Sequence, residues 1–176
     1  MTSDSANSTA IVLRPPVKDD GYRLHQLVAE CPPLDPNSIY CNLLQCSHFA
    51  ATGVAAEKDG NLVGFISGYI PPQQPETVFV WQVAVHEKGR GAGLAKRMLK
   101  DIVGRDACRD VTHMETTITA DNEASWALFR SFARDMGAEL THHEHFEKDT
   151  HFGGHHDSEF LLRIGPFSEH LSEQKA

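Results

Sequence analysis

Three glycines, Gly89, Gly91 and Gly93, stand between an apolar run at 78–85 and an amphipathic pattern that begins at Leu94. The apolar run predicts a buried strand, and apolar residues at three- and four-residue spacing predict a helix. Glycines let a ligand approach the backbone closely, and the first turn of a helix leaves N–H groups unpaired at the positive end of its dipole. The segment therefore predicts a site for a phosphorylated ligand, the alternative being a glycine-rich hairpin or helix entry that binds no ligand.

Three phosphate-binding motifs could account for this segment. A P-loop requires Gly-Lys followed by Ser or Thr, and the chain contains no such tripeptide. A dinucleotide fingerprint requires a third glycine where Lys96 stands. Residues 90–95 match Arg/Gln-x-x-Gly-x-Gly/Ala, and this pattern resembles the pyrophosphate loop of the GNAT N-acetyltransferases. The resemblance implies acetyl-CoA as cosubstrate and the GNAT (acyl-CoA N-acyltransferase) fold.

The resemblance extends to 121–129, which is similar to the family's Asn-x-x-Ala-x-x-Leu-Tyr segment. It implies that the backbone of Val83 and Val85 faces the pantetheine, and that Asn122 and Ser125 lie on the other flank of the cofactor. The amides that would hold the pyrophosphate belong to Arg90, Gly91, Ala92, Gly93, Leu94 and Ala95.

Phe129 departs from the family pattern, because a tyrosine often stands there and is proposed to protonate the departing thiolate. Phenylalanine cannot do this. A thiol with a pKa of about 8.5 is nevertheless a tolerable leaving group as an anion near neutral pH. Tyr40 or Tyr69 could also supply the proton.

Composition excludes several classes of function. The chain has 176 residues, enough for one well-packed domain, and its net charge of −8 disfavours nucleic acid and suits a cationic substrate. The first ten residues are polar, which argues against a signal peptide, and no apolar run is long enough to span a membrane. The four cysteines have no Cys-x-x-Cys spacing and are expected to be reduced thiols in a cytosolic protein.

The elements that must position these residues do not alternate regularly. Strands are expected at 11–14, 52–57, 61–69, 77–85, 111–119, 139–145 and 159–163, with a hairpin turn at 58–60. Helices are expected after a cap at Asp19 or Asp20, after 35–36, from the glycine segment to about 105, and from 122 to about 136. The order predicts a single-domain α/β fold whose mixed, mostly antiparallel central sheet is flanked by helices. The domain is expected at 11–167, with a disordered tail at 1–10 and a C-terminal tail at 168–176.

Within the GNAT family, residues 11–167 resemble the diaminobutyrate acetyltransferases, which catalyse the first committed step of ectoine synthesis. The segments that carry this resemblance are 34–44, 64–85, 116–129 and 151–165. It implies transfer of acetyl from acetyl-CoA to the γ (N4) amine of L-2,4-diaminobutyrate, with no metal, in an enzyme that forms a homodimer. Direct attack in a ternary complex is expected, because no cysteine has a paired-histidine context that would favour an acyl-enzyme.

An amine acceptor needs a proton acceptor. If its pKa resembles that of a lysine side chain, roughly 10.4, deprotonation at pH 7 costs about 4.6 kcal/mol, so the site should supply a base or lower that pKa. Glu159 is the candidate for amine binding and proton removal, with His156 beside it. Glu115 is a reserve base or an outward-facing strand residue. The resemblance to the family implies that a backbone N–H near Val83 stabilises the developing oxyanion.

Asp35, Tyr40 and Trp81 each have a structural alternative beside the functional one. Asp35 is expected to hold a substrate ammonium group, but it could instead cap a short helix. Tyr40 is expected to contact the substrate, but it could pack with Ile39 on the apolar side of that helix. Trp81 is expected to form an aromatic wall against the substrate, but it could be a core tryptophan. Tyr40, Trp81 and Glu159 are the candidate catalytic residues.

Six of the eleven histidines lie within 142–156 and raise the question of metal binding. Their spacing matches no recognised zinc pattern, so a solvated polar loop is expected. Lys96, Arg97 and Lys100 form a basic helix face that is either solvated or near the cofactor's 3′-phosphate. The rival functions are a GNAT enzyme for another small diamine or polyamine, a catalytically silent CoA-binding sensor, and a histidine-rich metal-binding module.

Overall fold

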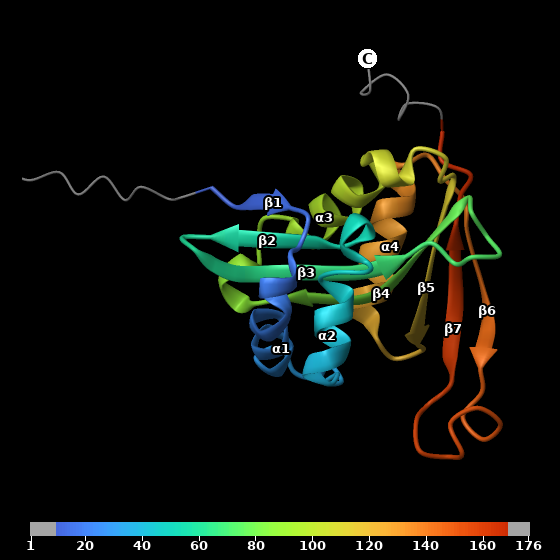
Figure 1. Ribbon diagram of the computed structural model, residues 1–176. Helices are drawn as coiled ribbons and strands as arrows, with labels where there is room; N and C mark the ends of the chain where they lie inside the picture. Colours follow the sequence, from blue (N-terminus) through green and yellow to red (C-terminus); the bar gives the residue numbers. More distant parts are fainter. Residues whose placement is uncertain (1–9, 169–176) are drawn as a thin grey trace, which may run out of the picture.

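The computed structural model describes residues 10–168, and its elements follow the expected order (Figure 1). The helices are α1 (Gly21–Ala29), α2 (Ile39–Gln45), α3 (Leu94–Val103) and α4 (Glu123–Asp135). The strands are β1 (Val12–Arg14), β2 (Val54–Lys58), β3 (Asn61–Tyr69), β4 (Thr77–Val85), β5 (His113–Thr119), β6 (Leu140–Phe146) and β7 (Glu159–Ile164). The tails expected at 1–10 and 168–176 lie outside the described residues, except for Ala10 and Ser168.

The seven strands of the described chain form one sheet in the order β1-β2-β3-β4-β5-β7-β6. Neighbouring strands are antiparallel except β4 and β5, which are parallel. Helices α1 and α2 cover one face of the sheet, and α3 and α4 cover the other (Figure 1). This arrangement confirms the expected mixed, mostly antiparallel sheet flanked by helices.

Alternation along the strands divides the apolar side chains between two cores. The larger core includes Met98 of α3, Phe129 and Phe132 of α4, and the strand residues that face these helices. The smaller core includes Leu24 of α1 and Phe65 of β3. Because apolar surface is buried on both faces, β4 is held at the centre of the domain.

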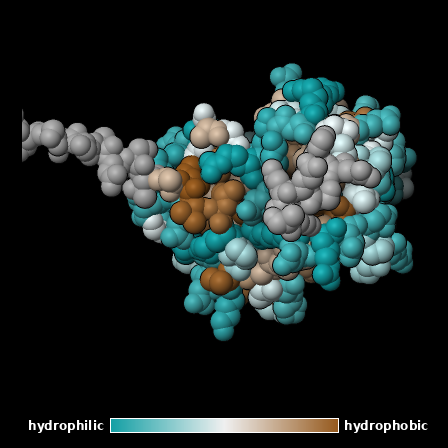
Figure 2. All heavy atoms as spheres, turned by 90° about the horizontal axis from the view of Figure 1, so that it is seen from above, coloured by the Kyte–Doolittle hydropathy of each residue, from teal (hydrophilic) through white to brown (hydrophobic). Residues whose placement is uncertain are grey.

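The surface seen from above is mostly hydrophilic (Figure 2). One hydrophobic patch gathers near the N-terminal end of the described chain, where Val12 and Val17 are exposed. Strand β1 lies at one edge of the sheet, so this patch is remote from the junction of β4 and β5. Across residues 10–168, no helix is both long and apolar enough to cross a bilayer.

The junction between β4 and β5 shapes the site. Pairing of the two strands ends at Val80 and Thr116, although β4 continues to Val85 and β5 to Thr119. The Thr116 hydroxyl donates to the Val80 carbonyl at 3.0 Å, where the gap begins. On the other edge of β4, Trp81 is the extra residue of a β-bulge against β3. A bulge bends its strand, and Figure 1 shows β5, β7 and β6 running away from β4.

The hairpin between β2 and β3 is confirmed. Asp59 and Gly60 have φ values of 53° and 76°, as a two-residue type I′ turn requires. Strand β2 begins at Val54, two residues later than expected, because Ala50–Thr52 form a 3₁₀ turn.

The expected cap of α1 is wrong. Asp20 occupies the N-cap position but makes no side-chain capping bond. Its buried carboxylate instead accepts hydrogen bonds from Arg14 at 2.7 Å, from Arg23 at 3.0 Å and from the Val17 N–H at 2.9 Å. The residue that was expected to start a helix therefore ties α1 to β1.

The side of α2 on which Tyr40 could have packed with Ile39 is not buried. The side chains of Ile39, Tyr40 and Leu43 are exposed, whereas Asn42 and Gln45 are buried. The two buried amides satisfy each other in part, since Asn42 Nδ2 donates to Gln45 Oε1 at 2.9 Å. Such a polar pair overrides the simple apolar pattern of a two-turn helix.

Candidate active site

Helix α3 begins directly after the glycine segment. Gly93 is the N-cap of α3, with φ of 62°, and it has no side chain to accept from the first turn. Gly91 also has a positive φ, 90°. The Arg97 N–H donates to the Gly93 carbonyl at 3.1 Å and begins the helical ladder. The N–H groups before it have no acceptor within the helix and are suited to an anion.

A cavity of about 410 Å³ opens at this helix end. Its lining consists of Val85, Gly89, Arg90, Gly91, Gly93, Leu94, Ala95 and Lys96, with Leu128 and Ser131 of α4. Most of the residues predicted to hold the pyrophosphate are therefore brought together. Ala92 is exposed and does not line the cavity, and Val83 is half-buried beside the larger core.

The predicted residues on the other flank of the cofactor meet at the start of α4. Asn122 is the N-cap of this helix, and its side-chain oxygen accepts from the Ser125 N–H at 3.2 Å. Asn122 therefore has a structural role that the sequence comparison with the family motif does not reveal.

The basic face of α3 is partly used in helix packing. Lys96 Nζ donates to Ser131 Oγ at 3.0 Å, and Lys96 and Lys100 reach Asp135 Oδ2 at 3.0 and 2.7 Å. Hydrogen bonds from these two lysines lower the pKa of Asp135 to about 2. The lysines thus join α3 to α4, while Arg97 remains exposed.

Aromatic side chains line the sheet beside the gap, on the face that α1 and α2 cover. The ring centroid of Tyr69 lies 5.4 Å from that of Phe79, 5.8 Å from that of Phe49 and 6.2 Å from that of Trp81. Trp81 is 43% exposed. It is therefore not a core residue, and its exposed indole can face a ligand.

Asp35 lies in the loop before α2 and is 87% exposed at its side chain. Ser38, rather than Asp35, caps the helix, because its Oγ accepts from the Cys41 N–H at 3.1 Å. Asp35 Oδ2 instead lies 3.9 Å from His156 Nε2. The capping alternative is excluded, and the carboxylate is available for a cation.

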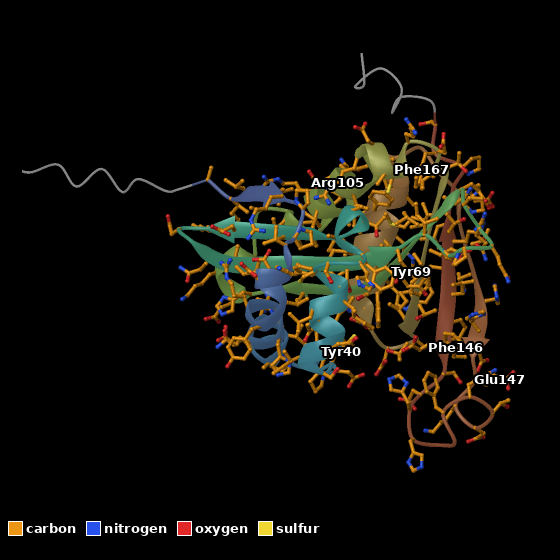
Figure 3. The ribbon with its side chains drawn as sticks, in the orientation of Figure 1. Tyr40, Tyr69, Arg105, Phe146, Glu147 and Phe167 are labelled. Atoms are coloured by element: carbon orange, nitrogen blue, oxygen red, sulfur yellow. The ribbon has the colours of Figure 1, made fainter. Side chains whose placement is uncertain are left out.

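Tyr40 is 70% exposed at the first turn of α2, so it does not pack on an apolar side of that helix. Figure 3 shows it at the end of α2 where the helix begins, whereas Tyr69 lies against the sheet nearer to β5. The two tyrosines considered as proton donors therefore occupy different parts of the face.

His156 and Glu159 lie in and after the loop that joins β6 to β7. The centroid of the His156 ring lies 4.7 Å from that of Phe152, with the two rings tilted by 42°, and its Nδ1 lies 2.7 Å from the Asp157 carbonyl. A carbonyl only accepts, so Nδ1 carries the proton and Nε2 faces Asp35. Glu159 is half-buried at the start of β7 and pairs with Thr119 at the end of β5.

A second, polar cavity of about 320 Å³ lies at the end of β5. Its lining comes from Thr119, Asp121, Lys148, Gly154, His155, His156 and Asp157. Figure 3 shows Phe146 and Glu147 at the end of β6 from which this loop departs. The loop therefore forms one wall of this polar cavity, and its His156 lies 3.9 Å from Asp35.

Glu115 is neither outward-facing nor free to act as a base. It is 7% exposed, and its Oε1 accepts from Arg163 at 2.6 Å. Arg163 also donates to Thr77 and lies 3.8 Å from Glu76. The carboxylate is thus engaged in an ion pair that links β5 to β7.

The histidine-rich segment is an exposed strand and turn. In the part of the chain that the structure describes, no group of three or more His, Cys, Asp or Glu side chains could hold a metal ion. His142 packs edge-on to Trp126 at 5.1 Å, and Arg130 lies over the same indole at 5.0 Å. These contacts give two of the polar residues a packing role.

Several residues of the site were missed by sequence reasoning. Gln82 contacts the loop of Asp35, Phe79 belongs to the aromatic cluster, and Leu128 and Ser131 line the cofactor cavity. The two α4 residues follow Asn122 and Ser125 at helical spacing, which is a signal that could have found them. The sequence contains no comparable signal for Gln82, because glutamine is common in strands and its hydrogen-bond partner lies 47 residues away.

Similar proteins agree on one family. Residues 21–133 match the model of the Acetyltransferase (GNAT) family. The chain is 50% identical to L-2,4-diaminobutyric acid acetyltransferase of Methylotuvimicrobium alcaliphilum, over 95% of this chain and 97% of that protein. It is 48% identical to the protein of that name from Vibrio cholerae, over 87% and 88% of the two chains.

A solved structure shares the fold. Diaminobutyrate acetyltransferase EctA from Paenibacillus lautus, in complex with L-2,4-diaminobutyric acid and coenzyme A, superimposes with a TM-score of 0.86. The two chains are 39% identical, over 92% of this chain and 98% of the other. With the glycine segment at a helix N-terminus and the parted strands β4 and β5, these matches show that the chain belongs to the GNAT family of acetyltransferases.

Proposed function

We propose that this chain transfers acetyl from acetyl-CoA to the γ-amine of L-2,4-diaminobutyrate, giving the N4-acetyl product and CoA. The observation that carries the proposal is the gap between β4 and β5. It joins the anion-binding end of α3 to a face with an exposed indole, Trp81, and an exposed carboxylate, Asp35. The acceptor itself is inferred from relatives that are 39–50% identical over nearly the whole chain and are named diaminobutyrate or diaminobutyric acid acetyltransferases.

The cofactor is proposed to bind along α3 and β4. Its pyrophosphate meets the N–H groups between Arg90 and Ala95, and its pantetheine follows the backbone of Val83 and Val85. Asn122 and Ser125 lie on the opposite flank. The gap next to Trp81 then receives the acetyl group, because there β4 has left its pairing with β5.

The acceptor carries two ammonium groups and one carboxylate, so it needs anionic partners for the ammonium groups and a base. Asp35 holds one ammonium group, and Trp81 packs on the short alkyl chain. Glu159 binds the reacting amine and accepts its proton, with His156 beside it. The neutral amine then attacks the thioester carbon, and an N–H near Val83 stabilises the oxyanion. The C–S bond breaks to release the CoA thiolate, and the nitrogen loses its second proton to water to give the neutral amide.

The thiolate leaves without help from residue 129. Phe129 is buried in the larger core and has no hydroxyl, so any proton must come from Tyr40, Tyr69 or water. Tyr69 lies closer to the proposed acetyl position, since it contacts Trp81. Tyr40 remains a candidate at the rim.

Direct transfer in a ternary complex is favoured over an acyl-enzyme. Burial raises the pKa of the Cys31 and Cys41 thiols and raises the pKa of Cys46 to about 12. A nucleophilic cysteine needs the opposite shift. Cys108 is buried in the larger core, away from the gap.

Steady-state release of free thiol from acetyl-CoA, measured with a panel of amines, tests the proposal. Turnover with L-2,4-diaminobutyrate well above that with ornithine or spermidine is expected, and a chelator should leave it unchanged. Preference for another amine would point to a different small-amine GNAT enzyme. Tight acetyl-CoA binding without turnover would favour a silent sensor, and zinc-dependent activity would favour a metal module.

The enzyme is further proposed to act in the cytoplasm, in ectoine synthesis, as a homodimer. The acidic net charge and the lack of any Cys-x-x-Cys spacing are consistent with the location. The pathway is inferred from the relatives.

A further inference from the structure

Gln82 joins the strand beside the acetyl position to the loop that carries Asp35. Its Nε2 donates to the Asp35 carbonyl at 3.1 Å, and its Oε1 accepts from Asn37 Nδ2 at 3.4 Å. The nitrogen and the oxygen of one side-chain amide therefore both form hydrogen bonds, with the residues on either side of Pro36. These contacts bridge 45 and 47 positions in sequence.

The same loop is also held by Leu34, which packs against the smaller core, and Asp35 Oδ2 lies 3.9 Å from His156 Nε2. The loop begins at a turn in which the Leu34 N–H donates to the Cys31 carbonyl, and it ends at the Ser38 cap of α2. Between these points Pro36 has no N–H, and the Asp35 side chain is largely exposed. The Asp35 backbone is thus oriented by Gln82.

Gln82 is also placed next to the residues that define the acetyl position. It follows Trp81, the extra residue of the bulge, and precedes Val83, whose neighbourhood is proposed to hold the oxyanion. Ser67 of β3 is its pairing partner, so its backbone is fixed from the next strand. Gln82 therefore connects the loop of Asp35 to the strand that carries Trp81 and Val83.

We infer that Gln82 is a positioning residue that selects the length of the acceptor. An acceptor held by Asp35 through one ammonium group presents its other amine at a distance set by its carbon chain. With the loop fixed, an acceptor longer by one methylene, such as ornithine, places its nucleophile wrongly. If the loop is released, binding of the short acceptor weakens and discrimination by length falls. This inference rests on the proposed function.

The test compares Gln82→Ala with wild type in acetylation of L-2,4-diaminobutyrate and ornithine. The KM for diaminobutyrate should rise about threefold to tenfold, as expected for loss of a hydrogen bond between neutral groups. The Kd of acetyl-CoA should not change, and the ratio of kcat/KM values for the two acceptors should fall. Asn37→Ala, which removes the longer bond alone, should have a smaller effect.

A double-mutant cycle separates positioning from general structural damage. If Gln82 acts through Asp35, Gln82→Ala should add little to the KM change caused by Asp35→Ala. Gln73→Ala, an exposed glutamine in the turn between β3 and β4, is the matched control and should leave both acceptors unaffected. Additive effects in the cycle, or a changed Kd for acetyl-CoA, would overturn the inference.

Hydrogen–deuterium exchange of the segment 34–38 provides a readout independent of turnover. Faster exchange in Gln82→Ala than in wild type is expected, and equal exchange would overturn the inference whatever the acceptor. If wild type does not acetylate diaminobutyrate, the proposed function fails while the exchange experiment still decides the role of Gln82. If wild type does so and Gln82→Ala behaves identically, the inference alone fails.

Discussion

At the scale of single residues, exposure decides between structural and functional alternatives that the sequence leaves open. Trp81 is too exposed for a core tryptophan, and Asp35 is not needed as a helix cap. Glu115, in contrast, has a structural role, because its carboxylate forms an ion pair with Arg163. The sequence identifies these residue types and their approximate places, but the partner of each depends on strand register, which local patterns do not contain.

Trp81 and Glu159 are expected to affect the acceptor and not the cofactor. Trp81→Ala should lower kcat/KM for diaminobutyrate by at least about tenfold, since a cation–π contact and an apolar wall are lost, while Trp81→Phe retains part of the activity. Glu159→Gln should lower kcat by about a hundredfold, because the base is removed and the shape is kept. Kinetics with calorimetric acetyl-CoA binding checks both. Loss of cofactor affinity in a folded variant would show that the side chain was misassigned.

Gly91 is predicted to be required for cofactor binding. Alanine at φ of 90° is strained by about 1–2 kcal/mol, and residue 91 lines the cavity where the pyrophosphate is proposed. The KM for acetyl-CoA should rise about tenfold. Gly60→Ala is the matched control, since Gly60 has φ of 76° in the distant β2–β3 turn and should lose stability without a change in KM. Equal KM values for the two variants would contradict the cofactor assignment.

At the scale of elements, the strands and the two long helices could be predicted because each buries one face with a clear period. The glycine segment and α3 are found where the sequence puts them, since Leu94, Met98 and Ile102 recur at helical spacing. The buried face of helix α2 could not be predicted from the same periodicity. Two turns are too short for periodicity to outweigh the buried Asn42–Gln45 pair.

Asp20 is predicted to stabilise the junction of β1 and α1 in a pH-dependent way. Burial alone would raise its pKa, but hydrogen bonds from Arg14 and the Val17 N–H outweigh this and lower it. Because the pKa is lower in the folded state, the carboxylate stabilises the fold at pH values above its unfolded pKa of about 3.9. This stabilisation is lost as the pH falls through the lower pKa of the folded state. Urea unfolding at pH 7 should show Asp20→Asn destabilised by about 2–3 kcal/mol, less than for a fully buried pair because Arg14 is partly exposed.

The destabilisation by Asp20→Asn should shrink at pH values below about 4, where wild type loses the same interaction. Asp19→Asn, in the exposed neighbouring residue, should change stability by less than about 0.5 kcal/mol. A pH-independent difference between wild type and Asp20→Asn would mean that the carboxylate charge is not what stabilises this junction.

At the scale of the whole molecule, the site exists because the sheet opens between β4 and β5. The order of elements was predictable, and so was the mostly antiparallel sheet. The end of pairing at Val80 and Thr116, and the bulge at Trp81, were not, because both depend on how distant strands align. For the same reason the loops of Asp35 and His156 are far apart in sequence yet meet at 3.9 Å.

A homodimer is the prediction that concerns the assembled molecule. Size-exclusion chromatography with light scattering should give twice the 19.5 kDa mass of the chain. The mass should persist on dilution through the concentrations used for kinetics. A monomer at all concentrations would contradict the prediction and leave the site within one chain intact.

Identification of the acetylated product tests the central claim most directly. The wild-type protein is incubated with acetyl-CoA and L-2,4-diaminobutyrate, and the product is analysed by mass spectrometry and two-dimensional NMR, alongside the yield of free thiol. One acetyl group on the γ-nitrogen for each thiol released is the expected result. Acetylation of the α-nitrogen, or thiol release without an acetylated amine, would contradict the proposed reaction.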